Sequence, residues 1–453
     1  MTPKLYSADL SPAVRASLLA IRALGVDVEL VPVNLMEQDH MKPEYLKMNP
    51  FHTVPTLEDG DFAIWDSAAI NIYLTEKYGK DDSLYPSNPE ARAVVNQRLF
   101  FNSGILFPRM GAIVASLLRE GAKTVSKDKA DSLTQGYTLL ETLLERSTYV
   151  AGEKLSLADL SIIATISSAN VLVPIASNRF PKTTEWISKM QALPYYEEAN
   201  QTGLNKFIGM VKSKLASGII ELFVIAAEND VIRSVHAKMP LTLHGYNLSP
   251  PVRATLLTLK ALGLEYNHIP VSPAAKQHLT PEYLKLNPLH TIPTLEDGDF
   301  VIYDSHAIIA YLADKYADGG ALYPKDVEKR AIINQRMYFD CGTMFPKFIE
   351  VIRAFFAGAK TISKDFIARI TEVYILLETL LENSTYVAGE ELSLADFSVV
   401  STVTSMNTVV PLATNRYPNI IKWIERLQEL PYYFEGNQEG VDKLAAAIKS
   451  MMS

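Results

Sequence analysis

Two serine residues, Ser11 and Ser249, each stand in front of a proline at the start of a predicted helix. A hydroxyl at such a place can donate a hydrogen bond to an anion, and the unpaired N–H groups of a helix N-terminus favour negative charge. The pairs Asp66-Ser67 and Asp304-Ser305 begin a second helix, where the backbone would attract a carboxylate. Taken alone, a serine before a helix is more often an ordinary N-cap.

Histidines and X-Pro bonds lie close to these helix starts. His52 and His290 each precede, by two residues, the bonds Val54-Pro55 and Ile292-Pro293. A lone histidine after Asn-Pro is more often a solvated turn residue. Only about one X-Pro bond in twenty is cis in folded proteins, so the local sequence favours a trans turn. No third histidine or carboxylate stands at ligand spacing, so we expect no metal site.

The segments that carry these residues are repeated. The stretch from His52 to Ser67, HTVPTLEDGDFAIWDS, returns from His290 to Ser305 as HTIPTLEDGDFVIYDS. Corresponding residues are 238 positions apart up to the helix that follows Phe107, and 237 apart beyond it. Solenoid repeats have periods of about 20 to 50 residues, far shorter than this one, so each copy should fold around its own core.

Strand and helix signals alternate at the start of each copy. In the first copy we predict strands at 3–8 and 28–33, a helix from Ser11 that closes at Gly25, and a short helix at 43–48. A hairpin and a further helix follow. This order is typical of a thioredoxin-like domain, in which a cis-proline would face the first helix.

Helical periodicity replaces the strand signals after Pro89. The expected fold is α/β plus all-α, twice, with thioredoxin-like domains at 1–80 and 239–318 and helical domains at 88–216 and 325–453. The predicted long helices span 91–118, 128–146, 157–171 and 183–193. The joining segment, 217–238, carries an apolar run too short to cross a bilayer, so a packed helix is favoured over a membrane anchor.

Several other residues have structural interpretations. The pairs Ser156 with Asp159 and Ser393 with Asp396 are typical of capping boxes at the start of a buried helix. We expect four aromatic residues to belong to the core: Tyr149, Tyr386, Trp186 and Trp423.

Composition narrows the class of protein. The 453 residues are 48% hydrophobic and 21% charged, with a net charge of -8 and no basic cluster. These values argue against nucleic acid or anionic lipid as the main partner. One cysteine, Cys341, excludes an intramolecular disulfide framework. The first residues, MTPKLYSADL, lack the features of a signal peptide, so we expect a cytoplasmic location.

Several spaced motifs resemble cytosolic glutathione transferases over nearly the whole chain, and most of all the insect delta and epsilon classes. The motifs are LSPAVRA and LSPPVRA, PEYLKMNPFHTVPTLEDGDF and PEYLKLNPLHTIPTLEDGDF, DSAAINIYL and DSHAIIAYL, and YVAGEKLSLADLS and YVAGEELSLADFS. The resemblance implies an N-terminal domain that binds glutathione and a helical domain that supplies most of an apolar pocket. Glutathione would be a co-substrate, without a further cofactor.

The resemblance also implies roles for individual residues. Ser11 and Ser249 would be catalytic, activating the glutathione thiol. Asp66 and Asp304, where relatives usually carry glutamate, would receive the α-amino group of glutathione. The whole glutathione-binding set is His40, His52, Val54, Pro55, Asp66, Ser67, His278, His290, Ile292, Pro293, Asp304 and Ser305. The second-substrate pocket would include Ala8, Phe107, Phe207, Tyr246, Phe345 and Leu444.

The implied function is the detoxifying conjugation of glutathione to apolar electrophiles, with peroxidase activity toward organic hydroperoxides as an additional expectation. A non-catalytic binding or structural protein of the same fold is the alternative. A thiol-exchange enzyme of the omega type would need cysteine in place of Ser11 and Ser249. We expect no nucleic-acid or membrane partner, and pairing of the two repeats within one chain, with a homodimer as the alternative.

Overall fold

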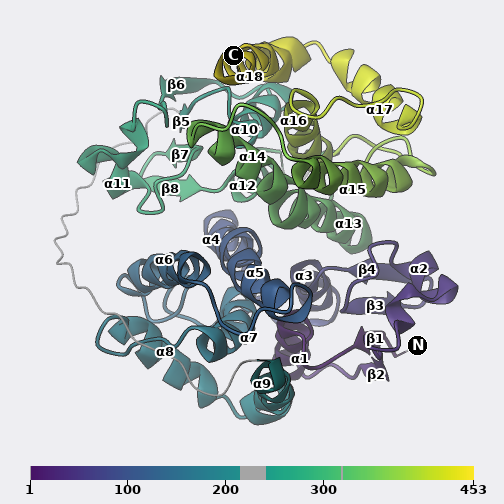
Figure 1. Ribbon diagram of the computed structural model, residues 1–453, viewed down its shortest axis with the longest axis vertical. Helices are drawn as coiled ribbons and strands as arrows, with labels where there is room; N and C mark the ends of the chain where they lie inside the picture. The colour runs from purple at the N-terminus through teal and green to yellow at the C-terminus, as the bar shows by residue number, and fades with distance from the viewer. Residues whose placement is uncertain (1, 215–240, 318–319, 453) are drawn as a thin grey trace. The chain divides into compact units, whose positions relative to one another are not determined.

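The computed structural model describes residues 2–214, 241–317 and 320–452 (Figure 1). The chain divides into two compact units at residues 234 and 235. The helix predicted in the joining segment, 217–238, lies outside the described residues.

A four-stranded mixed sheet forms the N-terminal part of the first unit, with strand order β2-β1-β3-β4. β1 and β2 are parallel, and β3 is antiparallel to both β1 and β4. Leu5, Leu57 and Ile64 point to one face of this sheet and are fully buried. The thioredoxin-like prediction is therefore confirmed. The elements are β1 (Lys4–Ser7), α1 (Pro12–Leu24), β2 (Glu29–Pro32), η1 (Asp39–Met41), α2 (Pro43–Met48), β3 (Thr56–Asp59), β4 (Phe62–Trp65) and α3 (Ser67–Tyr78).

The limits of α1 follow from three residues. Ser11 is the N-cap, Pro12 occupies the first turn, and Gly25 ends the helix in the left-handed conformation with φ of 64°. Proline fits the first turn because its missing N–H would be unpaired there, and glycine takes a positive φ without a Cβ clash. The predicted start and end of this helix are confirmed.

The second part of the unit is helical, and its first long helix is interrupted. The helix predicted from Ala91 to Leu118 is part of a continuous helical stretch, Pro89–Leu118, but a π-helical turn that was not predicted divides this stretch into α4 and α5. Pro108, in the first turn after the break, has no N–H to donate, so the α-helical hydrogen-bond ladder cannot run through unchanged. The elements are α4 (Pro89–Phe101), η2 (Asn102–Leu106), α5 (Phe107–Leu118), α6 (Lys127–Leu144), α7 (Leu157–Leu172), α8 (Pro181–Gln191), η3 (Glu197–Gln201) and α9 (Thr202–Lys214).

The second unit repeats this architecture in every element, with strand order β6-β5-β7-β8. Its N-terminal elements are β5 (Leu241–Gly245), α10 (Pro250–Ala261), β6 (Tyr266–Pro270), η4 (Gln277–Leu279), α11 (Pro281–Leu286), β7 (Thr294–Asp297), β8 (Phe300–Tyr303) and α12 (Ser305–Tyr316). Its helical elements are α13 (Val327–Phe339), η5 (Asp340–Met344), α14 (Phe345–Phe356), α15 (Lys364–Leu381), α16 (Leu394–Asn407), α17 (Pro418–Gln428), η6 (Phe434–Gln438) and α18 (Glu439–Met452).

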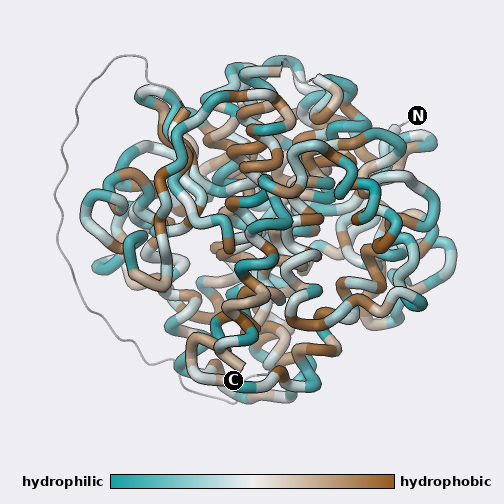
Figure 2. Tube along the Cα trace, turned by 90° about the horizontal axis from the view of Figure 1, so that it is seen from above, coloured by the Kyte–Doolittle hydropathy of each residue, from teal (hydrophilic) through white to brown (hydrophobic). Residues whose placement is uncertain are grey.

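α7 and α16 are the central helices of the two helical domains and are buried along almost their whole length. Figure 2 shows how hydrophobic (brown) and hydrophilic (teal) residues alternate along the chain trace. Each of these two helices begins with the predicted capping box. The Asp159 carboxylate accepts hydrogen bonds from the backbone N–H of the N-cap residue and from the Trp186 indole. Asp396 accepts the same two kinds of hydrogen bond in the second repeat, there from the Trp423 indole. Both tryptophans are 1% exposed, as expected of core residues.

Tyr149 and Tyr386, predicted to lie in the core, are only half-buried. Each pairs its backbone with a glycine three residues later, Gly152 or Gly389, at a surface turn. This turn, rather than core packing, explains their position, so the core assignment is wrong for the tyrosines.

The first helix of each unit also carries a buried cation. Arg15 in α1 and Arg253 in α10 are both completely buried. α1 packs on α7 and α10 packs on α16, so these guanidinium groups lie where the sheet domain meets the helical domain.

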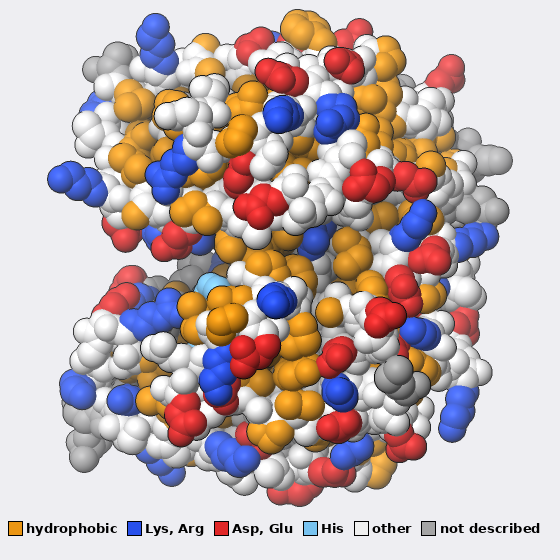
Figure 3. Space-filling model, turned by 90° about the vertical axis from the view of Figure 1, so that its right-hand side faces the viewer, with side chains coloured by type: hydrophobic (Ala, Val, Ile, Leu, Met, Phe, Trp, Pro, Cys, Tyr) orange, Lys and Arg blue, Asp and Glu red, His pale blue; other side chains and the backbone are white. Residues whose placement is uncertain are grey.

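By length and apolarity alone, one described helical stretch, Pro89–Leu118, could cross a membrane. It contains the break at η2, and core helices of soluble proteins pass the same test. Charged side chains of both signs are interspersed over the face shown in Figure 3.

Candidate functional site

Strand register brings the predicted site segments to one end of the sheet. Thr56, the first residue of β3, pairs with Tyr6 of β1 and with Trp65 of β4. Because β3 is antiparallel to both neighbours, its start lies beside the ends of β1 and β4. Three predicted segments therefore meet at this end of the sheet: those of Ser11, Pro55 and Asp66.

The second repeat has the same register. Thr294 begins β7 and pairs with His244 of β5 and with Tyr303 of β8. The corresponding end of this sheet gathers the segments of Ser249, Pro293 and Asp304.

The prolines at the centre of each site follow cis peptide bonds, Val54-Pro55 and Ile292-Pro293. The trans turn favoured by local sequence is therefore wrong. Tertiary contacts hold the preceding loop, because Asn49 Nδ2 donates to the Thr53 carbonyl at 2.9 Å and the Tyr45 hydroxyl donates to it at 2.5 Å. These buried side chains fix the backbone of residue 54, which is the part predicted to face glutathione.

The serines at the first helix of each repeat do not cap it with their side chains. Ser11 and Ser249 have the extended backbone of an N-cap, but neither hydroxyl accepts a hydrogen bond from the helix backbone. Both residues are partly exposed. An ordinary N-cap would use this oxygen to satisfy an N–H of the first turn. The hydroxyls are thus left for another partner.

The aspartates at the second helix do act as caps. Asp66 Oδ1 accepts from the backbone N–H groups of Ala68 and Ala69 at 2.9 and 3.2 Å. Its φ of 75° lies in a region that non-glycine residues rarely occupy. Burial of the carboxylate raises the pKa of Asp66 to about 6, although the two backbone N–H groups act in the opposite direction.

The two histidines of each repeat lie together. The rings of His40 and His52 have centroids 6.3 Å apart, and those of His278 and His290 are 6.4 Å apart. Burial first, and then the neighbouring histidine, lowers the pKa of His40, and the same causes lower that of His278. An uncharged histidine at this place can donate one hydrogen bond and accept another.

The second repeat carries one buried histidine that sequence analysis did not single out. His306 follows Ser305 and lies between Asp304 and Asp340, while Cys341 Sγ is within 4.8 Å of the nearest ligand atoms of Asp304 and His306. Asp340 is 34 positions away in sequence, in the π-helical turn η5. Only the difference between Ala68 and His306 in two otherwise similar motifs pointed to this place.

Family models match segments of both repeats. Two family models, each described as "Glutathione S-transferase, N-terminal domain", match residues 1–76 and 243–320. A third, described as "Glutathione S-transferase, C-terminal domain", matches residues 103–194 and 343–431. Glutathione S-transferase 1 of Manduca sexta is 43% identical over 218 residues, which are 48% of this chain and 100% of that protein. The chain belongs to the glutathione S-transferase family.

Other glutathione S-transferases give the same result. The Drosophila melanogaster glutathione S-transferase D6 is 38% identical over 195 residues, or 43% of this chain and 90% of that protein. Among solved structures, glutathione transferase E6 of Drosophila melanogaster is 48% identical and covers 47% of this chain and 97% of its own, with a TM-score of 0.46. Each relative covers about half of this chain because the chain contains two transferase units in tandem.

The residues predicted for the second-substrate pocket of each transferase unit differ in exposure. Phe107 is 36% exposed at the start of α5, and Phe345 is partly exposed at the start of α14. Ala8 and Tyr246, in the loops before the serines, are partly exposed as well. Two residues of the last helices, Phe207 and Leu444, are buried. The assignment of all six residues to the pocket stays a prediction.

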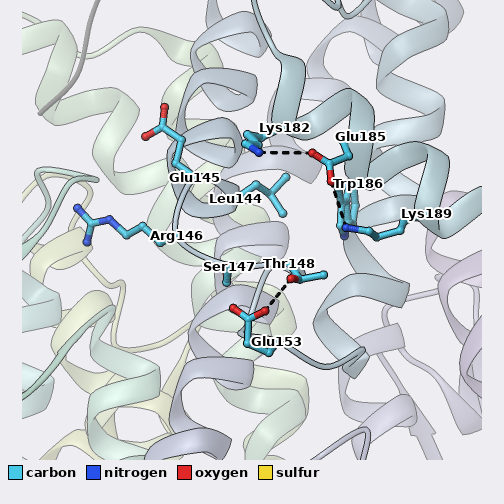
Figure 4. Close-up of a pocket in the computed structure, with 10 residues that line it drawn as sticks. All are labelled: Leu144, Glu145, Arg146, Ser147, Thr148, Glu153, Lys182, Glu185, Trp186 and Lys189. Carbon is cyan, nitrogen blue, oxygen red and sulfur yellow. Dashed lines mark hydrogen bonds and ion pairs between the residues drawn. The ribbon is translucent and has the colours of Figure 1, made fainter. Parts of the chain in front are cut away.

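A separate hollow of about 270 Å³ lies between the end of α6 and α8 (Figure 4). Its walls are polar, with Lys182 bound to Glu185 and Thr148 bound to Glu153. It contains none of the residues that resemblance to the transferases implicated, so we do not assign it to the transferase site.

Proposed function

We propose that each repeat conjugates reduced glutathione to apolar electrophiles, with the glutathione thiolate stabilised by Ser11 in the first repeat and by Ser249 in the second. The observation that supports this proposal is that both serines begin their helices without using their hydroxyls as caps. The hydroxyls are therefore available to donate to a sulfur anion.

This arrangement can supply the free energy that is needed to lower the pKa of the glutathione thiol. A free thiol has a pKa of about 8.5, and lowering it by two units takes about 2.7 kcal/mol. A charge-assisted hydrogen bond from one hydroxyl contributes about 1.5 to 3 kcal/mol, and the N-terminus of a helix adds about 0.3 to 1 kcal/mol. One serine at the start of one helix is sufficient.

The reaction then follows from the thiolate. The thiol proton passes to solvent, the sulfur forms a bond to the electrophilic carbon, and the leaving group departs with its bonding electrons. With an organic hydroperoxide, two glutathione molecules supply two electrons and yield an alcohol, water and glutathione disulfide. The start of α3 or α12, at Ser67 or Ser305, would hold the γ-glutamyl carboxylate, and Asp66 or Asp304 would hold the α-amino group.

Location and assembly belong to the same proposal. We infer a cytoplasmic enzyme that uses glutathione as co-substrate without a resident metal, and whose two repeats pair within one chain. The net charge of -8 suits a small-molecule enzyme better than a nucleic-acid or lipid-surface protein.

The test is conjugation of glutathione to an activated aryl halide by Ser11→Ala, Ser249→Ala and the double variant. Loss of both hydroxyls should lower kcat/KM by about 10- to 100-fold and move its pH profile upward. Ser126→Ala removes the N-cap serine of α6, whose side chain also makes no cap hydrogen bond, and should leave the rate unchanged because Ser126 is not among the residues predicted to bind glutathione. Full activity in the double variant would exclude the serine assignment.

A further inference from the structure

Three side chains with metal-binding donor atoms lie together in the second repeat. One ligand atom each from Asp304, His306 and Cys341 lies within 4.8 Å of the other two. His306 and Cys341 are buried, and the Asp304 side chain is 27% exposed. The three residues come from the start of α12 and from η5. The fold brings them together, so sequence spacing did not predict them as a metal site.

The separation of two of these ligand atoms fits a tetrahedral metal site. His306 Nδ1 is 3.3 Å from Asp304 Oδ1. A charge-assisted hydrogen bond is shorter, about 2.7 to 2.9 Å. Zinc binds imidazole nitrogen at about 2.0 to 2.1 Å and carboxylate oxygen at about 2.0 to 2.2 Å, so two such ligands at a tetrahedral angle are about 3.3 to 3.5 Å apart. These two groups could therefore take up an ion with little movement.

The other imidazole nitrogen has the partner that is typical of metal-binding histidines. His306 Nε2 is 3.1 Å from Asp340 Oδ2, and Ser398 Oγ donates to the same oxygen at 2.5 Å. Metal-binding histidines usually donate their second N–H to a carboxylate or a carbonyl, which fixes the tautomer and the ring orientation. With Nε2–H donating to Asp340, the lone pair of Nδ1 becomes available to a cation once its proton leaves.

The three kinds of ligand together select a thiophilic ion. Zn²⁺ accepts thiolate, imidazole and carboxylate ligands, whereas Mg²⁺ and Ca²⁺ are bound through oxygen. Three protein ligands leave a fourth position open for water. Binding would replace the thiol proton of Cys341 and the Nδ1 proton of His306 by the ion. The exposed part of the Asp304 side chain provides an entry path.

The first repeat lacks this group. Ala68 and Ser103 occupy the positions of His306 and Cys341, so only the aspartate of the three ligands is left there. Both units have the transferase fold and both serines, so the ion is not a requirement of conjugation.

We propose that Asp304, His306 and Cys341 bind Zn²⁺ or a similar thiophilic divalent cation, and that this ion excludes glutathione from the second repeat. The ion would occupy Asp304, to which the proposed function gives the α-amino group of glutathione. Metal binding does not depend on the proposed function, whereas the exclusion of glutathione rests on it. Zinc would then inhibit the second repeat and leave the first repeat active.

The experiment is spectrophotometric titration of the reduced full chain with Co²⁺, which replaces Zn²⁺ in such sites and reports its ligands. One ion per chain should bind with a thiolate-to-cobalt charge-transfer band and the intense visible bands of tetrahedral coordination, and Zn²⁺ should abolish both. The chain has one cysteine, so a charge-transfer band assigns Cys341 as a ligand.

Variants identify the remaining ligands. Cys341→Ser should remove the charge-transfer band, and His306→Ala should remove the tetrahedral spectrum. Asp340→Asn keeps all three ligands and should lower the affinity by about 10- to 100-fold.

A graft into the first repeat guards against misfolding of these variants. Ala68→His with Asn102→Asp and Ser103→Cys reproduces the three ligands and the supporting carboxylate, and should raise the stoichiometry to two ions per chain. A gained site cannot result from misfolding, and circular dichroism verifies the fold of each variant.

Exclusion of glutathione is tested by calorimetric titration with S-methylglutathione, a thioether that has no thiolate to bind zinc. The metal-free chain should show two binding sites and the zinc-loaded chain one. The Cys341→Ser chain should show two sites with and without zinc.

The possible failures are distinguishable. Absence of the charge-transfer band, or a spectrum that His306→Ala leaves unchanged, would refute the metal site. Equal binding of S-methylglutathione with and without zinc would refute the exclusion of glutathione. Failure of the metal-free chain to bind S-methylglutathione would refute the proposed function and the exclusion together, while the cobalt titration still decides the metal site.

Discussion

Arg15 Nη1 donates a hydrogen bond to Asn200 Oδ1 at 2.6 Å, across 185 positions of sequence. The same guanidinium contacts Ser167 and Ser168 in α7. In the second repeat, Arg253 Nε donates to Asn437 Oδ1 at 2.8 Å. One buried cation in each repeat therefore ties the helix that starts at the serine to the helical domain.

Asn200→Ala should destabilise the first repeat by about 2 to 4 kcal/mol. The change removes the amide acceptor of a buried guanidinium, and a buried charge that loses an acceptor costs far more than a lost neutral hydrogen bond. Thermal unfolding should show one transition shifted and the other unmoved. The matched control is Gln201→Ala, because this side chain donates to the exposed residue Asn205. A shift as large in this control would argue against the assignment.

Gly203→Ala should reduce conjugation by the first repeat. A Cβ at Gly203 would lie 2.1 Å from the Asp9 carbonyl oxygen, in the loop that leads to Ser11, so α9 and this loop must move apart. Gly209→Ala in the same helix meets no atom within 4 Å and should be neutral or stabilising by up to about 1 kcal/mol. Activity is measured in a Ser249→Ala background, and equal rates for the two glycine variants would contradict the prediction.

Asp159→Ala should destabilise the first helical domain by about 3 to 5 kcal/mol. This completely buried side chain accepts hydrogen bonds from the backbone of Val150 and Ser156 and from the Trp186 indole, all at 2.9 to 3.0 Å. The Ser156 hydroxyl also donates to it, so removing the carboxylate leaves four buried donors without this acceptor. Asp128→Ala, at the exposed start of α6, should cost at most about 1 kcal/mol. Denaturant unfolding compares the two variants.

His306→Gln should destabilise the second repeat in a pH-dependent manner. The folded pKa of His306, about 9, is above its ordinary value of 6.5, so the stabilisation is fully present below pH 6.5 and is lost as pH rises through 9. The difference in free energy of unfolding between wild type and variant should shrink by about 3 kcal/mol between pH 6 and pH 9.5. Denaturant titrations at both pH values measure it, and a constant difference would show that the imidazole is not charged.

The solution mass should be near that of one chain, 50.3 kDa. Tethering two units by a short segment gives an effective concentration in the millimolar range, far above that of a second free chain. Pairing of the repeats within the chain should therefore prevail over pairing between chains. Light scattering at decreasing protein concentration distinguishes pairing within a chain from pairing between chains. A mass that stays at twice this value on dilution would require association between chains.

Local signals in the sequence predicted the elements whose limits depend on neighbouring residues. Proline at the start and glycine at the end defined α1, and the short helix Pro43–Met48 has the predicted limits. The break at Asn102–Leu106 was missed because hydrophobic periodicity continues through a π-helical turn. One extra residue in a turn changes the direction of side chains but not the average pattern.

The site was predictable only in part, because side-chain contacts beyond the adjoining residues decide the rest. The cis form of Val54-Pro55 is fixed in a loop held by Tyr45 and Asn49, which no local preference at the bond reveals. His306 and Asp340 come from separate helical elements, and each looks unremarkable in its own segment. Family resemblance supplied the roles of Ser11 and Ser249, whereas the structure supplied the unused capping positions of their hydroxyls.

The packing of α1 on α7 also limits how the site can open. Rotation of the sheet domain as a rigid body would pull the buried guanidinium of Arg15 away from Asn200 and the α7 serines. Hinge closure of whole domains, which many enzymes use to enclose a substrate, is therefore disfavoured in each repeat. Admission of the electrophile and release of the conjugate must instead depend on short loops and side chains, whose motions take nanoseconds to microseconds rather than milliseconds.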